Sequence, residues 1–380
     1  MKSLKTLNLS PGQKVFLRAD LDVAIENGKV SDDFRLKKIL PTIQYLLAKK
    51  AQIILAGHLG RPHGKEDPKL SLKPVADWFI KQGLNIDFSM RSHLLRTPAV
   101  TAGVQSRLAG PGATSPEIIL LENLRFDIRE EENDAQFAKE MAGLADIYVN
   151  EAFAASYEEH ASIVGIPKLL PIFAGLQFEK EVNTLSQIFK NPQRPLIFLV
   201  GGVKPEKAAL IPSLAKIADT VLVNGQIANI LEVAPVKKDP AVKAGSFTPI
   251  LNRGRCDPSR RIVFPIDSIN QMDLGSQTIT MYLEILKQSK TTVWSGPLGK
   301  YEEQNYSKST KAIAEYLLNP NDQSLVIIGG GDTIAALHQF NLLNQLDQKP
   351  NCFISTGGGA MLQFLAQGTL PGIEALSPKR

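Results

Sequence analysis

Short apolar runs alternate along this chain with longer stretches of helical periodicity, and the alternation limits the possible folds more than any other feature. Each run is apolar on both faces, as expected of strands buried in a parallel sheet. Stretches between them, such as 35–50, have the period of a helix. The runs are 14–19, 51–57, 117–123, 146–152, 195–202, 219–225, 291–297, 324–331 and 352–359. The pattern predicts α/β architecture with doubly wound, Rossmann-like parallel sheets and ligands at the carboxyl ends of the strands.

The ends of the predicted strands differ between the two halves of the chain. Before about residue 165 they carry Arg, His and Asp, and after about residue 195 they carry Gly, Ser and Thr. The segment 170–195 between the halves has the pattern of a helix that prolines close. A chain of 380 residues with 43% hydrophobic content can bury two cores. We therefore expect two domains of similar size joined by this helix.

Composition narrows the class of ligand. Lys and Arg number 43 against 38 Asp and Glu, a mild excess that favours small anionic ligands over nucleic acid, because nucleic acid would require a clustered basic stripe. The two cysteines lack metal-ligand spacing, and the first residues lack the apolar run of a signal peptide. No apolar stretch is long enough to cross a bilayer. We expect a soluble, cytoplasmic protein that binds neither nucleic acid nor membrane.

Two segments of the second half repeat one construction, namely strand, glycine triplet and helix. They span 324–340 and 352–365. Backbone N–H groups and a helix N-terminus converge in such a turn, where a phosphate can bind. Asp332 could hold Mg²⁺ there, and Thr333 could donate to an oxygen. A single glycine triplet could equally be a tight turn, but two copies, together with a glycine pair ahead of Lys204 and Lys207, favour phosphate binding. The P-loop and GxGxxG patterns are absent from the sequence.

Charged side chains gather at the predicted strand ends of the first half. Taken singly, each is best explained as a surface ion pair or a capping group. Together they predict an anion pocket, since arginine binds phosphate or carboxylate with two hydrogen bonds. The set comprises Asp20, Asp22, Arg35, His58, Arg61 and Arg125. An anion site on one domain and a nucleotide site on the other suggest phosphoryl transfer. Transfer to a carboxylate needs no general base, so positioning and charge stabilisation suffice.

The motifs "RADLDV", "HLGRP", "LLENLRF", "GGVK", "WSGPLGKYE", "GGGDT" and "STGGGA" occur in an order that resembles phosphoglycerate kinase, of which this chain would be a divergent member. The resemblance runs from about residue 12 to 376. It implies a two-domain, hinge-bending kinase of glycolysis that transfers a phosphoryl group between 1,3-bisphosphoglycerate and Mg-ADP. It also implies that the C-terminal tail returns to the first domain. The expected division is 1–168 with 366–380, a hinge at 169–194, and 195–365. We expect a monomer whose partners are its small substrates.

The resemblance also implies roles for individual residues. The triose-phosphate site would comprise Asp20, Asp22, Arg35, His58, Arg61, Arg125 and Glu158. The ADP/ATP site would comprise Gly201, Lys204, Lys207, Gly225, Glu302, Gly330, Gly331, Asp332 and Thr333, with Asp332 as the Mg²⁺ ligand. The catalytic set would comprise Lys204, Arg35, Gly357 and Gly358.

The chain departs from the family pattern on both sides. Glu158 stands where the family has a substrate-binding arginine, and Asp22 where it has an asparagine, which makes the pocket more negative. The loop with Lys204 and Lys207 is one residue shorter, which leaves the role of Lys207 open, and 223–225 replaces an expected glycine triplet.

Two alternatives therefore stay open beside phosphoglycerate kinase. One is an acyl kinase with another carboxylate acceptor, and the other is a nucleotide-binding relative with weak catalysis or none.

Overall fold

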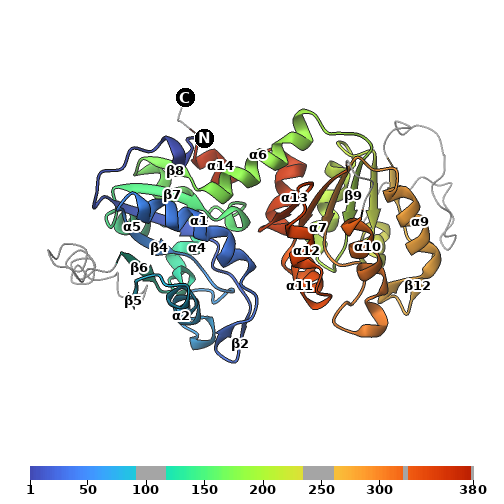
Figure 1. Cartoon of the computed structure of the whole chain (residues 1–380), viewed down its shortest axis with the longest axis horizontal. Coiled ribbons are helices and arrows are strands. Elements are labelled where there is room, and N and C mark those ends of the chain that lie inside the picture. The colour runs from blue at the N-terminus through green and yellow to red at the C-terminus, as the bar shows by residue number, and fades with distance from the viewer. Residues whose placement is uncertain (91–116, 234–260, 320–323, 378–380) are drawn as a thin grey trace. The chain divides into compact units, whose positions relative to one another are not determined.

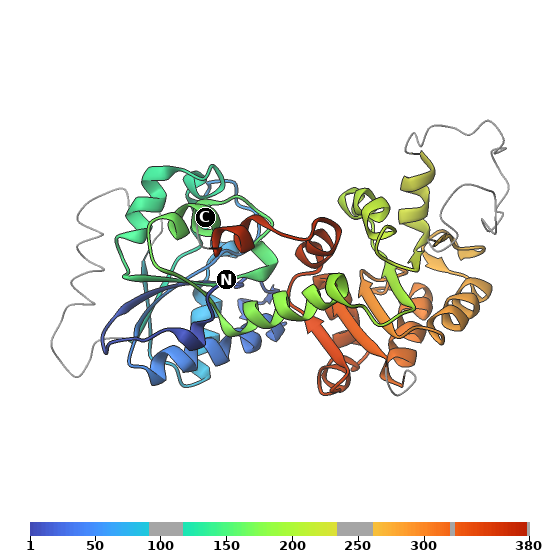
Figure 2. The ribbon, with the colours of Figure 1, turned by 90° about the horizontal axis from the view of Figure 1, so that it is seen from above.

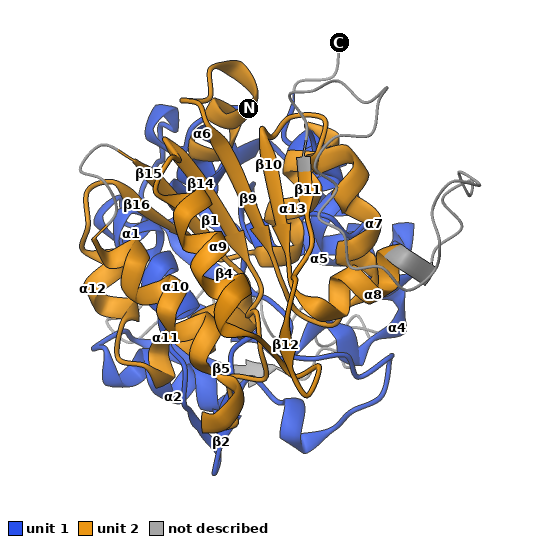
Figure 3. Ribbon diagram, turned by 90° about the vertical axis from the view of Figure 1, so that its right-hand side faces the viewer, with its two compact units in different colours: residues 1–183, 369–380 blue, residues 184–368 orange. Residues whose placement is uncertain are grey.

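The structure, a computed structural model, describes residues 1–90, 117–233, 261–319 and 324–377 (Figure 1). The chain forms two compact units, Met1–Asn183 with Thr369–Arg380 (unit 1) and Thr184–Gly368 (unit 2), shown in Figure 3. The division falls inside helix α6 (Leu176–Lys190), within the segment predicted to join the domains. The more detailed domain boundaries given above stay a prediction.

Unit 1 is built on a six-stranded parallel sheet with the order β5-β6-β4-β1-β7-β8. Its strands are β1 (Lys14–Ala19), β4 (Gln52–Ala56), β5 (Ile86–Met90), β6 (Ile118–Leu121), β7 (Ile147–Glu151) and β8 (Ile172–Ala174). A small hairpin pairs β2 (Ile25–Glu26) with β3 (Lys29–Val30). The helices are α1 (Phe34–Ala48), α2 (Lys73–Lys81), α4 (Ile128–Glu131), α5 (Ala135–Ala142) and α14 (Pro371–Ala375). Short helical turns include η4 (Leu124–Phe126), η5 (Phe153–Ala155) and η6 (Ala161–Gly165).

Unit 2 is built on a second six-stranded parallel sheet with the order β11-β10-β9-β14-β15-β16. Its strands are β9 (Leu196–Val200), β10 (Thr220–Val223), β11 (Arg261–Val263), β14 (Thr291–Ser295), β15 (Leu325–Gly329) and β16 (Cys352–Ser355), with a small pair β12 (Ser268–Ile269) and β13 (Asp273–Leu274). Its helices are α7 (Pro205–Leu214), α8 (Gly225–Val233), α9 (Ser276–Leu286), α10 (Lys308–Leu318), α11 (Gly331–Gln339), α12 (Leu343–Asp347) and α13 (Gly358–Gln367). Helix α7 packs beside α13, and α9 packs beside α10 (Figure 3).

The two sheets confirm the predicted fold class, and every predicted strand is present. Strands β5, β8 and β11 were not predicted. The stretch expected to be helical from residue 170 begins instead with strand β8, and α6 starts only at Leu176. The reason lies in buried Glu151, at the end of β7, whose carboxylate accepts the backbone N–H groups of Gln177 and Phe178 and so fixes where the helix begins.

Burial explains why these runs form central strands. Every residue of β4 after Gln52, and all of β7 and β9, is buried, as parallel strands covered on both faces require. One core of unit 1 packs β1 and β4 against α1 and α2. Strand β1 departs from the apolar pattern at Arg18, whose charged side chain has no exposed surface.

The C-terminal segment packs with unit 1. Gly372 N donates to Ser156 O at 2.9 Å, and Leu370 and Leu376 are buried. Figure 2 shows the red helix α14 among the elements of that unit. Among the described residues, no helix is both long and apolar enough to span a membrane.

Candidate active site

All predicted site residues lie in the described part of the chain, after the carboxyl ends of strands. Those of unit 1 follow β1, β4, β6 and β7, except Arg35, which lies in the first turn of α1. Those of unit 2 follow β9, β10, β14, β15 and β16. Because the strands of each sheet are parallel, these ends meet at one edge of each sheet.

Asp20, Asp22 and Arg35 form one side of the predicted anion site of unit 1, which is called the unit 1 pocket below. Asp22 Oδ1 accepts the backbone N–H of Gly60 at 2.9 Å, and Arg35 Nη1 donates to Asp22 O at 2.5 Å. Asp20 is 1% exposed, and its Oδ2 accepts Ala154 N at 2.8 Å. Burial raises the pKa of Asp20 even though Arg35 and other charges oppose the shift. These contacts fix the loop after β1 to the loops after β4 and β7.

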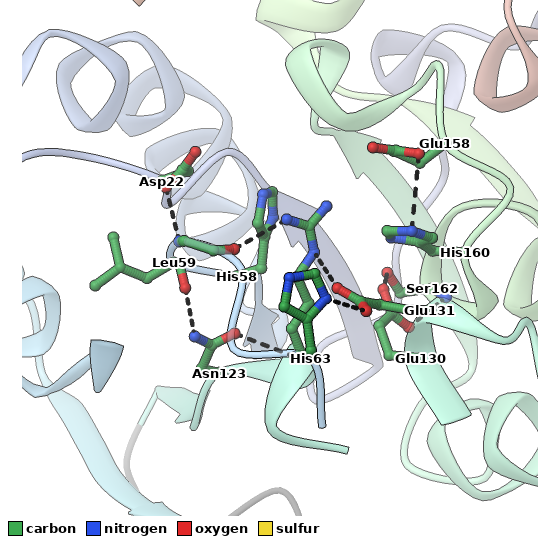
Figure 4. Close-up of polar contacts among 12 residues, drawn as sticks. Asp22, His58, Leu59, His63, Asn123, Glu130, Glu131, Glu158, His160 and Ser162 are labelled. Atoms are coloured by element: carbon green, nitrogen blue, oxygen red, sulfur yellow. Dashed lines mark hydrogen bonds and ion pairs between the residues drawn. The ribbon is translucent and has the colours of Figure 1, made fainter. Parts of the chain in front are cut away.

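Arg125 is a buried cation of the same pocket, and Figure 4 shows its neighbours Glu131 and Asn123. Only 5% of it is exposed; its Nη1 donates to Gly60 O at 2.9 Å, and its Nε lies 3.7 Å from Glu131 Oε1. Nε makes no hydrogen bond with the residues that the structure describes. Asn123 Oδ1 accepts Arg125 N and so orients η4. A guanidinium is suited to an anionic ligand, because it can bind phosphate or carboxylate with two hydrogen bonds.

The histidines of the pocket are uncharged. His58 is 6% exposed, and its pKa is held well below the ordinary range by burial and by the neighbouring arginines. Burial, Arg125, Arg18 and Arg61 lower the pKa of His160 to about 4. Positive charge in the pocket therefore comes from guanidinium groups. Arg61 itself is exposed after β4.

Glu158 lies near the arginines of this pocket. Its Oε2 is 3.9 Å from His160 Nε2, and the carboxylate accepts a hydrogen bond from Tyr157. Its charge acts on Arg125, as that of an internal counterion would. Since His160 is neutral near pH 7, Glu158 has no strong ion pair with it. Glu159 is exposed, as expected of a solvated neighbour.

In unit 2, the two lysines of the loop after β9 lie in different environments. Lys204 is exposed at the start of α7, whereas Lys207 is 9% exposed and donates to Gly201 O at 3.2 Å. Burial lowers the pKa of Lys207 to about 8, the charge of Asp332 opposes that shift, and Lys204 adds to it. Lys207 thus holds its own loop while remaining close to the acidic group at α11.

The two glycine triplets lie against each other. A Cβ on Gly358 would come within 2.1 Å of Gly330 Cα, so the loops after β15 and β16 touch through backbone. Gly330 has φ +114°, a conformation that L side chains rarely adopt. Thr333 Oγ1 accepts Gly296 N at 2.7 Å and donates to Gly329 O. The N-termini of α11 and α13 are therefore neighbours, and Asp332 is exposed in the first turn of α11.

The remaining predicted nucleotide residues are less enclosed. Gly225 begins α8 and has open space where a side chain would be, and Glu302 is exposed after β14. Val223 and Asn224 are buried, and Asn224 Nδ2 donates to Gly202 O at 3.1 Å. Among the described residues, no group of three or more His, Cys, Asp and Glu side chains could hold a metal ion.

Sequence reasoning missed the support behind the unit 1 pocket. Arg18, Glu130 and Ser162 are fully buried and hydrogen-bonded there. The available signal is Arg18 itself, a single arginine inside the apolar run 14–19.

Comparisons of the sequence and of the structure with known proteins find similar proteins. The family model described as phosphoglycerate kinase matches residues 4–243 and 250–368. A phosphoglycerate kinase of Leptospira biflexa is 37% identical over 97% of this chain and 96% of its own, and one of Desulforudis audaxviator is 35% identical over 99% and 98%. The solved structure of phosphoglycerate kinase from Coxiella burnetii is 30% identical, covers 98% of both chains and gives a TM-score of 0.70.

Proposed function

The chain belongs to the phosphoglycerate kinase family, and from this premise we propose which of its own residues carry the reaction. The enzyme is a phosphotransferase with a carboxyl group as acceptor, and it moves a phosphoryl group between 1,3-bisphosphoglycerate and ADP. The products are 3-phosphoglycerate and ATP, as in glycolysis.

The pocket of unit 1 binds the triose phosphate in this proposal. Arg35, Arg61 and Arg125 supply positive charge, and His58 supplies a neutral N–H. Asp20 and Asp22 hold the loops that carry these groups. The observation in its favour is that the charges of Arg125 and Arg61 act together on Tyr157 and His160. Glu158 stands beside the phosphate and weakens its binding.

The loops of unit 2 bind the nucleotide in this proposal. Phosphate oxygens accept from the backbone N–H groups of Gly330, Gly331 and Gly358 at the N-termini of α11 and α13, with Thr333 holding one turn and Gly357 N donating to Ser355 Oγ in the other. Lys204, exposed at the same sheet edge, stabilises the transferring phosphoryl group. Gly201, Lys207, Gly225 and Glu302 complete the ADP/ATP site. The observation that carries this assignment is the backbone contact of Gly330 with Gly358, which places two helix N-termini together.

Mg²⁺ fits the residues present. This ion keeps several waters and is usually held by one or two carboxylates together with substrate phosphates. Asp332 offers one exposed carboxylate in the first turn of α11, beside the proposed phosphate site. The ion would offset phosphate charge during transfer.

The chemistry requires no base from the protein. The nucleophile, a carboxylate of 3-phosphoglycerate, is already an anion, so Arg35 and Lys204 act by orienting the reacting groups and stabilising charge. We propose further that the enzyme acts as a cytoplasmic monomer. The cytoplasm is where glycolytic substrates are found, and the low cysteine content fits a reducing compartment.

A coupled assay tests the function. Purified protein receives Mg-ATP and 3-phosphoglycerate, and glyceraldehyde-3-phosphate dehydrogenase converts the product with oxidation of NADH. The expected result is NADH oxidation that depends on both substrates and stops when EDTA removes Mg²⁺. Absence of turnover in a folded sample would refute phosphoglycerate kinase activity.

A second function, acyl transfer to a less anionic carboxylate, is favoured by one observation, the carboxylate of Glu158 close to Arg125. A screen of carboxylic acids as acceptors separates the two. Turnover of 3-phosphoglycerate and of no other acid would exclude the second function. Calorimetry addresses the binding-only alternative, which predicts uptake of Mg-ADP but not of 3-phosphoglycerate.

A further inference from the structure

Arg18 lies in the middle of unit 1, at the last-but-one position of β1, with no exposed surface. Its guanidinium makes three hydrogen bonds. Nε donates to Ser162 Oγ at 2.7 Å, Nη1 donates to Ala19 O at 2.7 Å, and Nη2 lies 3.1 Å from His58 Nδ1. Such a group is therefore held in one orientation by partners on two sides.

The charge of Arg18 is balanced through Ser162. Ser162 Oγ donates to Glu130 Oε1, and Ser162 N donates to Glu130 Oε2 at 2.9 Å (Figure 4). Glu130 also has no exposed surface. The hydroxyl hydrogen is used toward Glu130, so the Ser162 oxygen is left to accept from Arg18 Nε. A buried cation and a buried anion thus share one bridging hydroxyl, which directs Nη2 at the histidine.

The contact with Arg18 determines where His58 carries its hydrogen. A guanidinium has donors only and stays protonated in proteins, so His58 Nδ1 must be the acceptor. A neutral imidazole has one donor nitrogen and one acceptor nitrogen, which leaves the hydrogen on Nε2. The charges that face the ring are those of Arg18, Arg125 and Arg35, with His160 as a further titratable neighbour. All of them oppose a second proton on the ring.

We propose that Arg18 is a positioning residue that fixes His58 as the neutral Nε2–H tautomer, so that the imidazole meets the triose phosphate as a hydrogen-bond donor. Within the described residues, His58 Nε2 has no hydrogen-bond partner, and the nitrogen is available to a ligand. The proposal rests on the assignment of this pocket to phosphoglycerate. It predicts that the contribution of His58 to binding does not change with pH across the neutral range.

The test is a ¹⁵N–¹H NMR spectrum of the histidine side chains in the full-length protein. The chain has 5 histidines, and the spectrum of His58→Gln identifies the signals of His58 by their loss. The expected result is an Nε2–H tautomer that does not titrate between about pH 5.5 and pH 8. A hydrogen on Nδ1, or titration within this range, would overturn the proposal.

A pair of variants tests the role of Arg18. Replacing either residue alone by a neutral one would leave the other as an uncompensated buried charge, so the variant is Arg18→Met with Glu130→Gln. The control is Arg18→Lys, which keeps the buried positive charge and a side-chain N–H donor. In the double variant His58 should lose its single tautomer and show signals of both the Nδ1–H and the Nε2–H form, while burial, Arg125 and Arg35 still oppose a second proton. The KM for 3-phosphoglycerate should rise about 10-fold, more than kcat falls. The control should keep the Nε2–H signal.

Retention of a fixed, non-titrating Nε2–H tautomer in the double variant would show that Arg18 does not set it. If the double variant does not fold, the wild-type spectrum still decides the tautomer. The spectrum needs no turnover, so an inactive protein with the expected tautomer would contradict the proposed function and leave this inference standing.

Discussion

The carboxylate of Glu158 lies among side chains that otherwise suit an anion. It accepts from Tyr157 and lies 3.9 Å from the neutral ring of His160, and its charge acts on Arg125. A substrate phosphate placed here meets both the attraction of the arginines and the repulsion of this carboxylate.

Glu158→Arg should therefore lower the KM for 3-phosphoglycerate. A charge-assisted contact is gained and a repulsion removed, and one such contact corresponds to about a 10-fold or greater effect. Steady-state kinetics in the coupled assay measure it. Glu159→Arg, an equal change of charge at the exposed neighbour, is the control and should have a much smaller effect. An unchanged or raised KM in Glu158→Arg would show that position 158 lies outside the pocket.

The sequence predicts the candidate ligand-binding residues better than the residues that support them. Arg35, His58 and Arg125 follow recognisable strands or open a helix, so their types and spacing indicate an anion site. The support of His58 by Arg18, Ser162 and Glu130 depends on three elements that are far apart in sequence and meet only in the fold. No local pattern marks a hydroxyl that bridges two buried charges.

At the scale of elements, helix α6 begins at a buried cap. Glu151 Oε1 accepts from Thr42 Oγ1 and Gln177 N, and Oε2 accepts from Phe178 N at 2.9 Å. The sequence predicts a helix in this region, but not its start. The start depends on Glu151, which lies far from α6 in the chain, and the strand β8 has only three residues.

Burial raises the pKa of Glu151 to about 7, with the capping donors opposing the shift. A raised pKa means that the folded state binds the proton more tightly than the unfolded state, whose value is near 4.5. The contribution of this group to stability is therefore full below pH 4.5 and is lost as the pH rises through 7.

Glu151→Gln removes this dependence. Between about pH 5.5 and pH 8, the wild type should lose about 2 kcal/mol of unfolding free energy relative to the variant. Urea unfolding of both proteins at the two pH values measures the difference and cancels the titration of other groups. A difference that stays constant with pH would mean that Glu151 is ionised throughout the range.

The turn before helix α13 offers a matched pair of glycines. A Cβ at Gly358 would meet Gly330 backbone at 2.1 Å, whereas nothing lies within 4 Å of a Cβ at Gly359. Gly358→Ala must push the two glycine-rich turns apart and should cost about 1–3 kcal/mol of stability. Gly359→Ala should be neutral or stabilise α13 by up to about 1 kcal/mol. Chemical unfolding compares them, and equal effects would show that the close approach of the loops is unimportant.

For the whole molecule, sequence periodicity was enough to predict two parallel α/β sheets, because strands buried on both faces produce apolar runs that are easily recognised. It was insufficient for three of the four strands at the sheet edges, since only β16 was predicted. Edge strands β5, β8 and β11 are short or less apolar, and they gain their pairing from neighbours already in place. The carboxyl edges of both sheets carry the predicted residues, in agreement with the rule for ligand sites in parallel sheets.

The most direct test of the central claim is the rate of NADH oxidation in the coupled assay, measured for the wild type and Lys204→Met together. Lys204 is exposed, so its replacement should leave the fold intact. The replacement removes the positive charge that is proposed to stabilise the transferring phosphoryl group. The wild type should turn over Mg-ATP and 3-phosphoglycerate, and the variant should lose at least about 100-fold in kcat. A folded wild type without turnover, or a variant as active as the wild type, would contradict this assignment.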